Sequence, residues 1–149
     1  MAEQTLPEDF KEFLQLLNEA DVRYLLIGGD AVGFHGYPRA TADIAIWVAI
    51  SPDNAEKLVE VFHRFGMTDP SVSPTLFLEQ GIIIRMGVPP IRIEVLTEID
   101  GVDFDECHAA RVTAEIDGQP VQLISRNHLL RNKRAAGRHK DLDDLENLT

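Results

Sequence analysis

Two adjacent glycines between an apolar run and a helical stretch constrain the fold of this chain most strongly. Tyr24–Ile27 reads as a short buried strand, Gly28-Gly29 breaks it, and residues 30–35 fit a short helix. Glycine lets the backbone approach a ligand closely, and the first N–H groups of a helix are unpaired and attract anions. The pattern predicts a strand, a glycine turn and a helix, with space for a phosphate. A simple tight turn explains the two glycines equally well.

Similar local signals mark the other elements. Ser51-Pro52 offers an N-cap and a first-turn proline, Asp117-Gly118 is a hairpin-turn signal, and Ser125 can cap a helix that Gly137 ends. The predicted strands are 24–27, 43–50, 75–78, 82–86, 91–96, 112–116 and 121–124, and the predicted helices are 7–19, 30–35, 52–65, 126–136 and 141–147. The chain is therefore expected to be α+β, with a mixed, mostly antiparallel sheet flanked by helices.

Length and cysteine content narrow the class of protein. With 149 residues and 44% hydrophobic content, the chain fits one domain, 1–149, that buries a core without disulfides. The single cysteine, Cys107, excludes an internal disulfide and a multi-cysteine zinc site, and it fits a reducing compartment. No signal peptide is recognisable, and the apolar runs are far shorter than the roughly 20 residues that span a bilayer. We expect a soluble cytoplasmic protein with no membrane partner.

Charge is polarised along the chain. The formal net charge of -11 argues against broad binding to nucleic acid, which needs Lys and Arg in excess on one face. Six of the fourteen basic residues nevertheless fall close together near the C-terminus: Arg126, Arg131, Lys133, Arg134, Arg138 and Lys140. The sequence predicts a local basic patch there, whereas the acidic run 141–146 is typical of a solvated helix face.

Carboxylates on two predicted strands suggest a metal site that has only some of the ligands it needs. Residues two apart in a strand point to the same face, so Asp43 and position 45 project side by side, but position 45 is Ala. Phosphoryl or nucleotidyl transfer by two metals needs clustered carboxylates that hold Mg²⁺ ions about 3.5–4 Å apart. Glu94, a lone acid in an apolar strand, either serves such a site or faces solvent.

Three segments in order carry a resemblance to a known superfamily. YLLIGGDAVGFHGYPRATADIAIWV (24–48), RMGVPPIRIEVLTEIDGVDFDE (85–106) and LISRNHLLRNKRAAGRHKDLDDLENL (123–148) resemble the motifs of the DNA-polymerase-β-like nucleotidyltransferases. The likeness is to the small bacterial members, namely AbiEii-type toxins and minimal nucleotidyltransferases of toxin–antitoxin systems. It covers nearly the whole chain and implies the nucleotidyltransferase fold.

The resemblance also implies roles for individual residues. Gly28 and Gly29 would hold the nucleotide phosphates, and Asp43 and Glu94 would be metal ligands and catalytic carboxylates. Glu94 stands where the family commonly has Asp. Three basic residues would contact the triphosphate, although a solvated surface charge explains each of them as well: Arg39, Lys133 and Lys140. The implied cofactors are two Mg²⁺ ions, which Mn²⁺ can replace, with an NTP such as ATP as substrate.

The chain departs from the family pattern at Ala45, where D-x-D requires a second acid. A methyl group cannot coordinate Mg²⁺, and even the loss of an outer-shell partner of a metal site costs about 10–100-fold. Whether this alanine is natural or was introduced deliberately, the sequence predicts an impaired nucleotidyltransferase.

Two functions follow from these features. The first is transfer of a nucleotidyl group from an NTP to a hydroxyl of RNA, for example a tRNA end, or of protein. The alternative is an inactive nucleotide- or partner-binding module, such as one component of a toxin–antitoxin pair that contacts its cognate protein. For His35 a structural hydrogen bond is favoured over contact with a base, and for Trp47 core packing is favoured over a place at the site.

Overall fold

The chain folds as one mixed sheet with helices around it. The computed structural model describes residues 7–36, 43–87 and 92–148. In chain order the elements are α1 (Glu8–Glu19), β1 (Tyr24–Ile27), α2 (Gly29–Phe34), β2 (Asp43–Val48), α3 (Pro52–Arg64), the 3₁₀ helix η1 (Pro74–Leu78), β3 (Ile83–Met86), β4 (Arg92–Leu96), α4 (Phe104–Ala109), β5 (Val112–Ile116), β6 (Gln119–Leu123), α5 (Arg126–Ala136) and α6 (His139–Leu148). Within the described part of the chain, no helix is long and apolar enough to cross a membrane.

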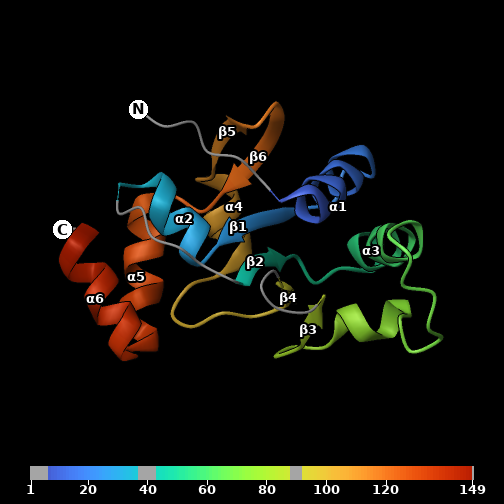
Figure 1. Ribbon diagram of the computed structural model, residues 1–149. Coiled ribbons are helices and arrows are strands. Elements are labelled where there is room, and N and C mark those ends of the chain that lie inside the picture. The colour runs from blue at the N-terminus through green and yellow to red at the C-terminus, as the bar shows by residue number, and fades with distance from the viewer. Residues whose placement is uncertain (1–6, 37–42, 88–91, 149) are drawn as a thin grey trace.

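The sheet has six strands in the order β3-β4-β2-β1-β6-β5. Neighbours β3–β4, β1–β2 and β5–β6 are antiparallel, whereas β2–β4 and β1–β6 are parallel. The predicted α+β class with a mixed, mostly antiparallel sheet is therefore confirmed. Figure 1 shows α1 and α3 grouped on one side of the molecule and α5 and α6 on the other.

Aromatic packing ties the first helices together. Phe13 of α1 meets Phe62 of α3 edge-on at 5.7 Å between ring centroids, and Phe62 meets Phe77 of η1 at 5.2 Å. All three side chains are fully buried. Edge-to-face aromatic contacts of this kind add to the free energy gained by burying the rings, so they fix α1, α3 and η1 as one layer of the core.

The predicted capping and turn residues act as expected. The Ser51 hydroxyl accepts a hydrogen bond from the Asn54 N–H at the start of α3, and Ser125 accepts one from the His128 N–H at the start of α5. Asp117 and Gly118 have φ of 50° and 78°, the two positive values that a tight hairpin between β5 and β6 requires.

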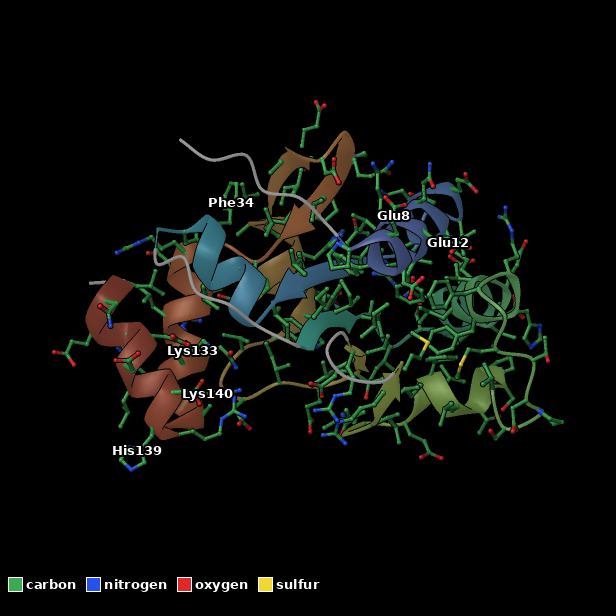
Figure 2. All side chains as sticks on the ribbon, viewed as in Figure 1. Glu8, Glu12, Phe34, Lys133, His139 and Lys140 are labelled. Carbon is green, nitrogen blue, oxygen red and sulfur yellow. The ribbon has the colours of Figure 1, made fainter. Side chains whose placement is uncertain are left out.

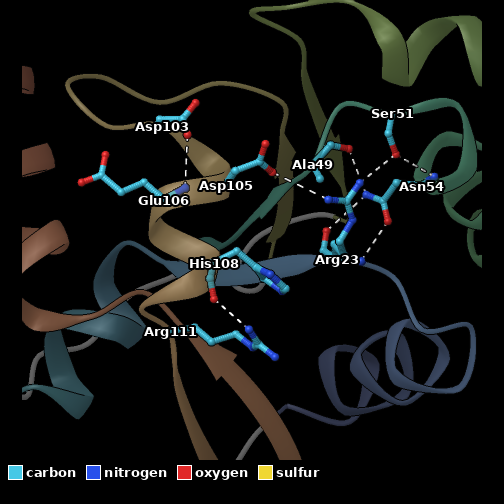
Figure 3. Close-up of polar contacts among 9 residues, drawn as sticks. All are labelled: Arg23, Ala49, Ser51, Asn54, Asp103, Asp105, Glu106, His108 and Arg111. Carbon is cyan, nitrogen blue, oxygen red and sulfur yellow. Dashed lines mark hydrogen bonds and ion pairs between the residues drawn. The ribbon is translucent and has the colours of Figure 1, made fainter.

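Asn54 shows how a buried polar group is accommodated next to this cap (Figure 3). Its side chain accepts a hydrogen bond from the Arg23 N–H at 2.8 Å and donates to the Arg23 and Ala49 carbonyls at 3.2 and 2.9 Å. The amide therefore joins the start of β1 to the chain that leaves β2, and the oxygen and nitrogen of this buried side chain both have partners.

One predicted strand is wrong, and one helix was not predicted. Residues 75–78 form η1 rather than a strand, because Pro74 begins a helical turn and the Leu76 N–H bonds to the Ser73 carbonyl. The apolar run is buried through Phe77 without joining the sheet. α4 starts where the Asp103 carboxylate accepts a hydrogen bond from the Glu106 N–H.

Candidate functional site

A cleft of about 450 Å³ lies between the sheet and the α5–α6 pair. We use "the cleft" for this cavity. Five residues that the sequence singled out line it, although they come from four separate segments of the chain: Gly28, Ala45, Glu94, Lys133 and Lys140. Figure 2 shows Lys133 and Lys140 on the α5–α6 side. The fold thus brings these five predicted residues together.

A row of cross-strand neighbours lies along the sheet side of the cleft. Ile27 of β1 pairs in register with Ala45 of β2, Ala45 pairs with Glu94 of β4, and Glu94 pairs with Arg85 of β3. Cross-strand partners point to the same face of a sheet, and all four residues line the cleft. We call these four residues the cross-strand row. It places the methyl group of Ala45 directly beside Glu94.

Gly28 closes one end of this row. It has a φ of 74°, a conformation that side-chain-bearing residues rarely adopt. A Cβ atom built at Gly28 would lie 3.4 Å from the Cβ of Ala45, which is an ordinary van der Waals contact, so the positive φ rather than a lack of space favours glycine here. Gly29 begins α2 immediately afterwards. The predicted strand, glycine turn and helix is therefore present, and its turn opens on the cleft.

Glu94 is engaged with an arginine. Its Oε2 atom lies 3.3 Å from Arg85 Nε, and the Glu94 side chain is 17% exposed whereas that of Arg85 is 57% exposed. The carboxylate is thus largely shielded from solvent and has a cation beside it.

Two interpretations were open for Lys133, a contact with the triphosphate or a solvated surface charge. The second interpretation is wrong. The residue is 3% exposed, and its ammonium lies 3.1 Å from Asp141 Oδ1 and 3.2 Å from Asp144 Oδ2. Both aspartates are 0% exposed, so the prediction of a solvated acidic face over 141–146 is wrong for them. The physical reason is that α6 packs against α5, which makes two carboxylates the internal partners of a buried lysine.

Arg138 completes this buried cluster from the rim of the cleft. Its Nε and Nη2 atoms donate to Asp141 Oδ2 and Oδ1 at 2.6 and 3.4 Å. This bonding raises the pKa of Arg138 above its ordinary value. Burial alone would raise the pKa of Asp141, but the hydrogen bonds from Arg138 and Lys133 outweigh burial and hold that pKa below its ordinary value.

Two of the other predicted site residues lie wholly or partly outside the described part of the chain. Arg39 and the side chain of Asp43 lie outside the described residues, although the backbone of Asp43 pairs in register with Arg92. Lys140 lines the cleft and is exposed.

A two-metal site does not fit the described residues. Among the side chains with described placement, no three from His, Cys, Asp and Glu are grouped to hold a metal ion. At the centre of the cross-strand row stands the methyl of Ala45, and the neighbouring Glu94 is paired with Arg85. Two metal ions about 3.5–4 Å apart need bridging carboxylates, and the row supplies only one.

The remaining candidates have structural roles. His35 Nε2 lies 2.8 Å from the Ile124 carbonyl oxygen, and Trp47 is 2% exposed and packs edge-on against Phe104. Both findings agree with the favoured interpretations. Burial, followed by the nearby charge of Glu106, raises the pKa of Cys107 to about 11, so its thiolate is scarce at neutral pH.

Sequence reasoning did not single out Arg85 and Arg138 as site residues. Arg138 belonged to the basic segment near the C-terminus, but nothing distinguished it from its neighbours. Arg85 lies on an edge strand, and its proximity to Glu94 becomes visible only when β3 and β4 are paired in register.

We predict that Lys133→Met lowers the free energy of unfolding by about 3–5 kcal/mol, because it leaves Asp141 and Asp144 buried without their cation. The matched control is Lys140→Met at the exposed rim, which should change stability by less than about 0.5 kcal/mol. Urea denaturation at neutral pH measures both. Equal stability of the two variants would contradict a buried ion cluster.

We also predict a pH signature from Asp141. Because its folded pKa lies below the ordinary value of 3.8, its ionised form stabilises the fold fully above that value, and this stabilisation is lost as pH falls through the folded pKa. Asp141→Asn should therefore be less stable than the parent at pH 7, and the difference should shrink below pH 3.8. A difference that is independent of pH, measured by urea denaturation, would rule out this role.

Comparison with known proteins gives structural neighbours only. No protein-family model and no curated protein matches the sequence. The inferred nucleotidyltransferase TM1012 of Thermotoga maritima aligns over 97% of this chain and 94% of its own, with a TM-score of 0.63 and 14% identity. The lincosamide antibiotic adenylyltransferase LnuA, solved with lincomycin bound, aligns over 98% of both chains with a TM-score of 0.56 and 13% identity.

A third neighbour has the same fold in a longer chain. An antigenic nucleotidyltransferase-like protein from Paracoccidioides brasiliensis aligns over 94% of this chain and 74% of its own, with a TM-score of 0.54 and 19% identity. The likeness therefore extends over nearly the full length of the sequence. This chain has the nucleotidyltransferase fold.

Proposed function

We propose that the chain binds a nucleoside triphosphate in the cleft and belongs functionally to the nucleotidyltransferases, with transfer impaired by Ala45. The observation that supports this most is the meeting of Gly28, the cross-strand row and Lys140 around one cavity. The fold of its structural neighbours is consistent with nucleotidyl transfer in general. A nearer assignment to the AbiEii-like type is part of the proposal and rests on the three sequence motifs.

The reaction proposed is attack of a hydroxyl oxygen on the α-phosphorus of the NTP. The new bond joins this oxygen to phosphorus, the bond to the bridging oxygen of pyrophosphate breaks, and the hydroxyl proton leaves to a base or to solvent. In this chain Glu94 is the carboxylate of the cross-strand row, and it lies 3.3 Å from Arg85 Nε. The missing second acid makes transfer slow or absent.

A second, smaller cavity favours a protein acceptor over RNA. It has a volume of about 220 Å³, and it shares Glu98 and Ile99 with the cleft. Asp103, Asp105 and the aromatic ring of Phe104 also line it. Acidic walls repel a phosphate backbone, so a hydroxyl-bearing protein side chain suits this cavity better than a tRNA end.

A non-catalytic nucleotide-binding module is the second candidate, and one specific observation favours it. The ion pair between Glu94 and Arg85 engages the one carboxylate of the cross-strand row. Such a protein would retain nucleotide affinity but not transfer, for example as a component of a toxin–antitoxin pair.

We predict that Ala45→Asp raises transfer in the presence of Mg²⁺ by at least about 10–100-fold, because it restores the second acid beside Glu94. The measurement follows label from an NTP marked at the α-phosphate into total tRNA and into the protein itself. Ala45→Asn, which adds the same bulk without charge, is the matched control and should gain far less.

Three results separate the candidates. Rescue by Asp but not by Asn supports an impaired transferase. Nucleotide binding by the parent and by Ala45→Asp, with no transfer by either, supports the binding module. Failure of both proteins to bind any of the four NTPs in calorimetry rejects both candidates.

A further inference from the structure

We propose that the second cavity, the space of about 220 Å³ beside the cleft, binds an organic cation that also carries an oxygen atom, such as a hydroxylated amine. The oxygen accepts a hydrogen bond from the indole N–H of Trp47, and the positive charge lies between Glu98 and Asp103. Binding of this group does not depend on a nucleotide. Only its use as the acceptor of nucleotidyl transfer rests on the proposed function.

Trp47 is a buried polar side chain in the wall of the second cavity. It is 2% exposed, and within the described part of the chain its Nε1 atom has no hydrogen-bond partner. Residues two apart in a strand point to the same face, so the indole rises from the face of β2 that carries Ala45 and the cleft. The N–H group of a buried tryptophan normally has a partner, and a bound oxygen atom would supply one.

The second cavity and the cleft are neighbours on this face of the sheet. Glu98 and Ile99 line both of them. Trp47 also pairs in register with Leu96, which lines the cleft. A ligand in the second cavity therefore lies next to the space that we assign to the nucleotide.

Two acidic side chains of the second cavity are available to a cation. Asp105 is not one of them, because Arg23 Nη1 lies 3.7 Å from its Oδ1 atom (Figure 3). In the described part of the chain, no basic side chain forms an ion pair with Glu98 or Asp103. Asp103 Oδ2 accepts a hydrogen bond from the Glu106 N–H at 3.1 Å, so Oδ1 is left for a ligand. The two carboxylates favour a cation over an anion.

Apolar side chains complete the wall: Ile50, Val102 and Phe104. Aromatic rings attract cations, so Phe104 adds to the effect of the carboxylates. A hydrogen-bond donor, two carboxylates and apolar groups around one small space fit an ammonium ion on a short hydroxylated carbon chain. They do not fit a phosphate group, which the carboxylates would repel.

The ring of Phe104 is the competing partner for the Trp47 N–H. The two rings meet at 83° with their centroids 5.0 Å apart, so one ring directs an edge toward the other. An N–H···π contact is weaker than a hydrogen bond to oxygen, so a ligand oxygen would replace it. If the contact were closed to ligands, no ligand would change the environment of this N–H.

The experiment titrates three small probes into the ¹⁵N-labelled chain at pH 7 without nucleotide. Trp47 is the only tryptophan, so its indole N–H gives a resonance of its own. Diaminopropanol, which is glycerol with both terminal hydroxyls replaced by amines, carries charge and oxygen. Diaminopropane lacks the oxygen, and glycerol itself lacks the charge.

We expect diaminopropanol to move the indole resonance in a saturable way. Diaminopropane should bind about 2–10-fold more weakly, because it cannot accept the hydrogen bond from Trp47. Glycerol should bind about tenfold more weakly, because it loses the attraction to both carboxylates.

Variants locate the site. Glu98→Gln and Asp103→Asn should each weaken diaminopropanol binding about 2–5-fold, the worth of an exposed ion pair, and asparagine still caps α4. The matched control is Glu115→Gln, an exposed acid of β5 that lines neither cavity, and it should bind as the parent does. Trp47→Phe, followed through the Val102 amide, should bind diaminopropanol and diaminopropane equally. If Trp47→Phe does not fold, the three probes on the parent decide.

A second set of probes distinguishes a small molecule from a protein side chain as the source of the cation. A capped tripeptide with serine between two lysines carries the same chemistry, and norleucine in place of lysine removes its charge. Tighter binding of the lysine peptide than of diaminopropanol, lost with norleucine, identifies a basic segment of a protein. Tighter binding of diaminopropanol identifies a small amine.

The outcomes are separate from those of the proposed function. An indole resonance that does not move at the highest soluble concentration of diaminopropanol would overturn the inference, as would equal binding of glycerol and diaminopropanol. Failure of the chain to bind any NTP would reject the proposed function and leave this site standing, because the titration contains no nucleotide.

Discussion

The register between β2, β4 and β3 is the constraint on which the candidate site depends. It places Ala45, Glu94 and Arg85 next to one another on one face of the sheet, and β1 adds Ile27 and the Gly28 turn at the end of the row. A shift of register by one residue would turn these side chains to the other face and bring their apolar neighbours into the cleft. The buried residues Ile44, Ile46, Ile93 and Val95 fix the register, because they alternate with the row and belong to the core. The chemistry of the cleft is thus set by the packing of the opposite face.

The α5–α6 side of the cleft, its second wall, is held together by charged side chains as well as by apolar packing. Lys133, Asp141 and Asp144 are buried between α5 and α6, and Arg138 extends the cluster to the rim of the cleft. Burying these charges is costly, so the cluster is stabilising only while all of its members are present. It also orients Arg138. Each side of the cleft therefore has an arginine that lines it and contacts a carboxylate, Arg85 with Glu94 on the sheet and Arg138 with Asp141 on the helices.

Much of the fold could be predicted because its signals are local. The Gly28-Gly29 turn, the Ser51 and Ser125 caps and the Asp117-Gly118 hairpin depend only on residues close in sequence. The strand predicted for residues 75–78 is wrong because a short apolar run fits a strand or a buried helical turn equally well. In the site, five of the predicted residues share one cleft, whereas Arg39 and the side chain of Asp43 lie outside the described residues. Two features depend on long-range packing and had no local signal. These are the burial of Lys133 and the pairing of Arg85 with Glu94.

The central claim is that a nucleotide occupies the cleft between the cross-strand row and the α5–α6 pair. The most direct measurement is a two-dimensional NMR titration of the ¹⁵N-labelled chain with ATP. The account predicts the largest amide shifts at Gly28, Glu94 and Lys140, which line the cleft from three separate segments, with little change in α1 and α3. Shifts confined to α1 and α3, or no shifts at saturating ATP, would contradict it.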